Sequence, residues 1–173
     1  MHCLLEFVET QKECSNSPTG IMIDASFLIQ LLKLGTSASI EEFIHGVIIP
    51  YLKGLLLIYK RVDIIFDVYL LKSLKYELRV TRGVGEMKRV RLTTEMPRNF
   101  RAFLCVDGHK TELNQLVAQE VSGLDCPEGT LIVATKGEDV LSSSNLESFE
   151  MIAPSDHEES ETRTLLHTAH MKS

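Results

Sequence analysis

The sequence predicts an α/β fold in which a mainly parallel central sheet is enclosed by helices. Short, strand-length runs of mainly apolar residues occur at 20–24, 62–67 and 130–135. Parallel strands that are buried on both faces have this composition. Between these runs, apolar residues recur with the spacing of helices. Strands that alternate with helices favour a three-layer α/β sandwich.

The first half of the chain is expected to contain one strand and two helices. The strand 20–24 is followed by a helix over 26–34 that Gly35 ends. Ser39 is a suitable N-cap for the next helix, in which Pro50 should produce a kink or a break. The expected inward positions of the first helix are Phe27, Leu28, Leu31 and Leu32.

The second half continues the alternation. A strand over 62–67 leads into a basic segment that is predicted to be helical to about residue 80, and residues 93–108 give no clear pattern. A helix follows at 111–121, with Leu113, Leu116 and Val117 facing inward. A strand at 130–135, a further strand at 149–152 and a final helix over about 157–170 complete the prediction.

Length and composition indicate one domain. The chain has 173 residues, of which 44% are hydrophobic and 24% are charged, which is ordinary globular usage. Residues 1–19 are expected to be a flexible lead-in, and residues 20–173 to form the domain. The apolar stretch 46–59 is interrupted by Lys53 and Pro50 and is shorter than the roughly 20 residues that span a bilayer, so no membrane association is expected.

The four cysteines are not paired in any CxxC motif, and no basic, apolar leader begins the chain. We therefore expect an intracellular protein of the cytoplasm or nucleus that is not secreted. We expect the four cysteines to be thiols that are buried or have no chemical role. Zinc binding is not expected, because tetrahedral zinc sites usually show paired ligands. His167 and His170 are three residues apart and could bind a metal, but exposure to solvent near the end of the chain is the favoured interpretation.

Carboxylates fall where a functional site is expected. Asp24 and Asp67 each close a predicted buried strand, and an acidic cluster of Glu158, Glu159 and Glu161 follows the predicted strand 149–152. Ligands of α/β sheets gather outside the carboxyl ends of the strands. Carboxylate oxygens are the ligands that Mg²⁺ and Mn²⁺ prefer.

Each acid also has a structural interpretation. Asp24 could cap the following helix, and Asp67 could begin a turn. The three glutamates lie in the first turn of a predicted helix, where acids interact favourably with the helix dipole. Within that cluster we rank Glu158 first as a metal ligand, then Glu161, then Glu159.

Three motifs together resemble the PIN-like, flap-endonuclease-type nuclease superfamily. They are Ile-Asp-Ala-Ser around Asp24, Ile-Phe-Asp-Val-Tyr around Asp67, and Ala-Pro-Ser-Asp-His-Glu-Glu-Ser-Glu, which contains Glu158. The resemblance implies a Rossmann-like sandwich and a nuclease that hydrolyses phosphodiesters. It also implies a site for two Mg²⁺ or Mn²⁺ ions, with Asp24, Asp67 and Glu158 as catalytic ligands. The family's second helix acid falls at Ser160, which leaves Glu159 and Glu161 as neighbouring candidates.

The resemblance also implies a nucleic-acid partner, with DNA favoured over RNA. In the family, the stretch after the second Asp grips phosphates. Here this stretch contains Lys72, Lys75, Arg79 and Arg82, which share one predicted helical face that would suit a phosphate backbone. A solvated basic helix is the alternative. The segment 72–92 has seven basic and two acidic residues, although the whole chain carries a formal charge of −6.

The family's last strand, with its Asp-x-Asp pair, has no counterpart before Ser173. The domain is therefore expected to be incomplete at its C-terminus, and catalysis by this chain stays an open expectation. The alternative is a non-catalytic module that keeps the fold and binds nucleic acid or a protein. Oligomeric state is not indicated by the sequence.

Overall fold

The computed structural model describes residues 19–32, 34–67, 89–144, 148–155 and 160–171. It shows an α/β domain with a four-stranded sheet in the order β1-β2-β3-β4. The strands are β1 (Gly20–Asp24), β2 (Arg61–Ile65), β3 (Leu131–Lys136) and β4 (Asp139–Ser142). β1 and β3 both run parallel to β2, whereas β4 is antiparallel to β3. The predicted fold class, with a mainly parallel sheet, is confirmed.

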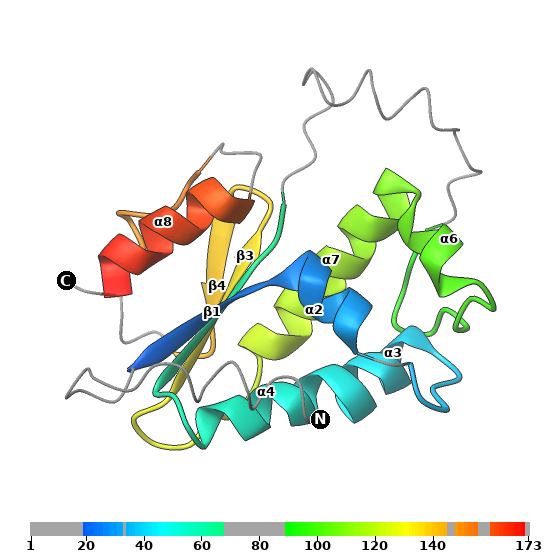
Figure 1. The fold of residues 1–173 in the computed structure, drawn as a ribbon, viewed down its shortest axis with the longest axis horizontal. Helices are drawn as coiled ribbons and strands as arrows, with labels where there is room; N and C mark the ends of the chain where they lie inside the picture. Colours follow the sequence, from blue (N-terminus) through cyan, green and yellow to red (C-terminus); the bar gives the residue numbers. More distant parts are fainter. Residues whose placement is uncertain (1–18, 33, 68–88, 145–147, 156–159, 172–173) are drawn as a thin grey trace.

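Helices lie on both sides of this sheet, an arrangement compatible with a three-layer sandwich (Figure 1). Parallel strands added one after another through right-handed crossovers place their connecting helices on one face. That face carries the helices between β1 and β3, and α8 lies on the other. The helices are α2 (Ala25–Leu31), α3 (Ile40–Phe43), a π-helix (Ile44–Ile48), α4 (Ile49–Leu56), α6 (Phe100–Leu104), α7 (Asp107–Ser122) and α8 (Ser160–Met171).

The two faces of β2 differ in chemistry. Val62 and Ile64 belong to the buried apolar core that α4 and α7 cover. Arg61 and Asp63 alternate with them, as strand geometry requires, and both are buried as well. The face that carries α8 is therefore held partly by polar groups.

The helix after β1 buries two of its four expected inward positions, Leu28 fully and Leu32 in part. Phe27 and Leu31 are 60% and 41% exposed, whereas Ala25, Leu28 and Ile29 are buried. The prediction was wrong for Phe27 and Leu31, because α2 begins at Ala25, directly after β1, and turns Ala25 and Ile29 inward instead. The start of the helix sets which side turns toward the sheet.

Pro50 was predicted to kink or break its helix. In the structure a π-helical turn, Ile44–Ile48, precedes it. Ser39 caps α3, as predicted, by accepting a hydrogen bond from the Glu42 N–H. The N–H of Ile49 bonds the carbonyl of Ile44, five residues earlier. Because proline has no N–H, the wider turn directly before Pro50 lets the helix continue into α4 without a break.

The second half of the chain contains the largest correction. Residues 149–152 form a turn and not a strand, and Met151 is 78% exposed. The fourth strand is instead β4, which pairs with β3 through a tight turn at Gly137, where φ is +59°. The region 93–108, which gave no pattern, contains α6 and the start of α7. β1 and β3 are confirmed to within a residue, whereas β2 ends at Ile65, two residues before its predicted end.

None of the helices in the described ranges has the length and apolar character needed to cross a membrane.

Candidate functional site

Asp24 and Asp67 lie at the same edge of the sheet. Asp24 is the last residue of β1, and Asp67 follows the end of β2 by two residues. Because β1 and β2 are adjacent and parallel, their carboxyl ends meet at one edge, where α/β proteins bind ligands. Asp24 is exposed and Asp67 is half-buried, so both carboxylates can be reached from outside the core.

Ser160, at the start of α8, joins the two carboxylates. Its hydroxyl donates a hydrogen bond to Oδ2 of Asp24 at 2.6 Å, and its backbone N–H donates to Oδ1 of Asp67 at 3.0 Å. Ser160 is only 3% exposed. One residue therefore contacts acids that are 43 positions apart in the sequence. We call Asp24, Asp67 and Ser160 the acidic edge.

The structural interpretation of Asp24 holds alongside its place at this edge. Its Oδ1 accepts a hydrogen bond of 2.7 Å from the Phe27 N–H, so Asp24 is the N-cap of α2. Such a bond satisfies one of the unpaired donors at the helix start. Its role as a metal ligand stays a prediction.

The backbone just before Asp67 is fixed by two buried side chains. The hydroxyl of Thr135, on β3, accepts a 2.7 Å hydrogen bond from the Phe66 N–H. Arg163, on α8, donates to the Gly137 carbonyl at 2.7 Å and makes a longer 3.5 Å contact with the Phe66 carbonyl. Burial lowers the pKa of the Arg163 guanidinium, and the Glu138 carboxylate opposes that shift.

Among the described residues, Glu161 is the one other predicted acid, and it is not brought to the acidic edge. Glu161 is exposed, and successive helix residues point about 100° apart, so it diverges from Ser160. Glu158 and Glu159 lie outside the described residues, as do Lys72, Lys75, Arg79 and Arg82. The acidic cluster also does not follow a strand, because residues 149–152 form a turn.

A cavity of about 170 Å³ opens beside Asp67. Phe66, Thr135, Lys136 and Asn114 also line it. Both amide atoms of Asn114 are buried, and neither has a hydrogen-bond partner among the described residues. The volume is below the roughly 300–1,000 Å³ of pockets for drug-sized ligands, so this cavity suits a small group or an ion. Asp24 and Ser160 are not among the residues that line it.

The donor atoms of the acidic edge fit a hard divalent cation. The two carboxylates offer oxygen ligands, which Mg²⁺ and Mn²⁺ prefer over nitrogen or sulfur. Within the described ranges, no three His, Cys, Asp or Glu side chains gather as a ready set of metal ligands. Any cation here would be held through Asp24 and Asp67.

A second polar cluster, which the sequence did not reveal, lies further along α8. Asp63 is fully buried, and both of its oxygens are bonded by Arg61, at 2.7 and 2.9 Å. His167 Nδ1 lies 2.7 Å from Asp63 Oδ2, and Arg61 also contacts His170 at 3.0 Å. We call these four residues the buried ion cluster.

The expectation that both histidines are exposed was wrong. His167 is 1% exposed, and His170 is partly buried. They occupy the inward face of α8, where a buried carboxylate and a guanidinium provide hydrogen-bond partners. An Asp within the otherwise apolar strand Val62–Ile65 was the available signal, because a buried acid requires a partner.

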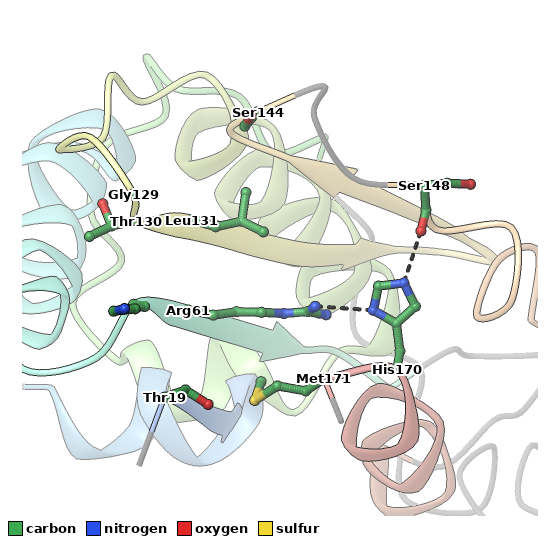
Figure 2. Close-up of a pocket in the computed structure, with 10 residues that line it drawn as sticks. Thr19, Arg61, Gly129, Thr130, Leu131, Ser144, Ser148, His170 and Met171 are labelled. Atoms are coloured by element: carbon green, nitrogen blue, oxygen red, sulfur yellow. Dashed lines mark hydrogen bonds between the residues drawn. The ribbon is translucent and has the colours of Figure 1, made fainter. Parts of the chain in front are cut away.

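The larger cavity, of about 580 Å³, lies at the opposite edge of the sheet from Asp24 and Asp67. Figure 2 shows Arg61 directed toward His170, which in turn bonds the Ser148 carbonyl at 2.8 Å. The Arg61 guanidinium also lies 5.7 Å from the centre of the Phe149 ring. These contacts use the polar groups of this wall to hold α8, so the cavity is not our candidate site.

No protein-family model, curated protein or solved structure matches this chain.

Proposed function

We propose that this chain is a PIN-like, nuclease-type domain whose acidic edge binds a divalent cation and acts on nucleic-acid phosphodiesters. The observation that carries the proposal is the contact of one residue, Ser160, with both Asp24 and Asp67. The two acids that the resemblance selects from distant motifs share one edge of the sheet. Their oxygens suit Mg²⁺ or Mn²⁺.

In this proposal Asp24 and Asp67 hold the cation. A bound cation would lower the pKa of a coordinated water and stabilise the negative charge of the leaving oxygen. Asp24 also keeps the start of α2 in place, and Thr135 fixes the backbone next to Asp67. The carboxylates are thus positioned by rigid elements, which favours a defined site.

A second candidate function is a non-catalytic module that binds nucleic acid. The observation in its favour is that Ser160 stands where the resemblance expects an acid. A hydroxyl contributes no negative charge, so the edge holds cations less strongly than a three-carboxylate site would. In this reading the fold remains and the hydrolytic chemistry is lost.

Cleavage of labelled single-stranded and flap DNA in Mn²⁺ or in EDTA tests the proposal. We expect cleavage in Mn²⁺ only, and we expect Asp67→Asn to abolish it. Asp139→Asn is the matched control, because Asp139 is an exposed acid on β4. DNA binding without cleavage, unchanged in Asp67→Asn, would favour the non-catalytic module. Cleavage that survives in Asp67→Asn would refute the proposed site.

A further inference from the structure

The inward face of α8 is polar. Ser160, Arg163 and His167 have helical spacing of three and four residues, and each is at most 3% exposed. All three bond strand ends or strand residues. In the described part of the chain, no α8 residue belongs to the buried apolar core, and Leu165 is 70% exposed. The attachment of α8 therefore relies on hydrogen bonds rather than on the apolar stripe typical of a surface helix.

The first of these attachments uses the atoms that a cation would use. Ser160 directs its O–H at Asp24 and its N–H at Asp67. The other oxygen of Asp24 is already engaged by the Phe27 N–H. The positive ends of the Ser160 donors thus face one oxygen of each carboxylate and compete with a cation for those atoms.

We propose that Ser160 is an autoinhibitory latch, so that docking of the start of α8 and cation binding at Asp24 and Asp67 exclude each other. This inference rests on the proposed function of the acidic edge. A ligand that binds only one of two states shifts the equilibrium toward that state. Cation binding should therefore loosen α8, and loosening α8 should strengthen cation binding by the same factor.

Calorimetric titration of Mn²⁺ into the full chain provides the first test. The Ser160 hydroxyl bonds an ionised group, so its removal in Ser160→Ala should raise Mn²⁺ affinity roughly ten- to 150-fold. Ser160→Thr keeps the hydroxyl and should restore the original affinity. Thr162→Ala, on the same helix, is the control and should leave the affinity unchanged.

Hydrogen exchange of the α8 amides provides a second readout that does not require catalysis. Exchange in the unmodified chain should accelerate when Mn²⁺ is added, and in Ser160→Ala it should be fast already without Mn²⁺. The Asp24→Asn/Asp67→Asn variant should show no response to Mn²⁺. Circular dichroism of each variant checks that it is folded.

The outcomes separate the two proposals. Mn²⁺ binding that is unchanged or weaker in Ser160→Ala, or slower α8 exchange with Mn²⁺, overturns the latch and leaves the cation site standing. No Mn²⁺ binding in either the unmodified chain or Ser160→Ala overturns the proposed function, and the latch with it.

Discussion

The buried ion cluster allows a quantitative prediction of stability. Asp63 has no exposed surface, and its two oxygens receive hydrogen bonds from Arg61 and His167 of 2.7 to 2.9 Å. A carboxylate only accepts hydrogen bonds, so the Nδ1 atom of His167 carries the proton toward it. Replacement of Asp63 by valine removes the acceptor and leaves the Arg61 guanidinium, which is 8% exposed, without its carboxylate.

Breaking a buried ion pair by removing one partner costs about 3–5 kcal/mol. Asp63→Val should therefore lower the free energy of unfolding by about that amount, out of a typical total of 5–15 kcal/mol. His167→Leu should cost less, about 1.5–3 kcal/mol, because Asp63 keeps its two bonds to Arg61. The triple change Arg61→Met/Asp63→Val/His167→Leu replaces all three polar side chains by apolar ones and should recover most of the loss.

Urea denaturation, followed by circular dichroism, measures these differences, provided that the slope with denaturant is the same in each variant. The order of the three losses in the free energy of unfolding is a better test than any single value, because each value depends on how far the structure around the substitution relaxes. If Asp63→Val loses less than about 1 kcal/mol, or less than His167→Leu loses, then Asp63 is not the centre of this cluster.

Three further predictions concern other parts of the fold. Burial and the nearby Tyr59 raise the pKa of Tyr51 above its ordinary value of 10.0. The unfolded chain therefore ionises first, and stability should fall as the pH rises above about 10. Denaturation midpoints from pH 9 to 11 should show a smaller fall in Tyr51→Phe. Thr135→Val leaves the Phe66 N–H buried without a partner and should cost about 1–3 kcal/mol in urea denaturation, and an equal stability would contradict the role of Thr135. Ser39→Ala removes the α3 cap and should cost about 1 kcal/mol by thermal denaturation, whereas Thr36→Ala, at an exposed threonine nearby, provides the hydroxyl control.

Two of the parallel strands were predictable from composition. β1 and β3 are runs of apolar residues with few alternatives, and both appear where expected. β4 was missed because it is a short edge strand, Asp139–Ser142, in a polar stretch. Residues 149–152 have the composition of a strand, but Ile152 alone is buried there and the segment turns back on itself. Local composition does not distinguish an apolar turn from a strand.

The candidate site was predictable only in part, for a different reason. Asp24 and Asp67 could be placed together because each was predicted to close a strand of a parallel sheet, and Asp67 lies two residues beyond the end of β2. Ser160 could not, because a serine at the start of a helix usually has a local role, and its contacts here lie 93 and 136 residues away. The pairing of His167 with Asp63 spans 104 residues and depends on which face α8 turns inward.

A Mn²⁺ titration on the unmodified chain and on Asp24→Asn/Asp67→Asn tests the central claim most directly. Asparagine is as good an N-cap as aspartate and retains a carbonyl that can accept from Ser160, so the variant removes charge and keeps the fold. We predict Mn²⁺ binding to the unmodified chain and none to the variant. Equal binding by both, or no binding by the unmodified chain and none by Ser160→Ala, would mean that these carboxylates serve the structure alone.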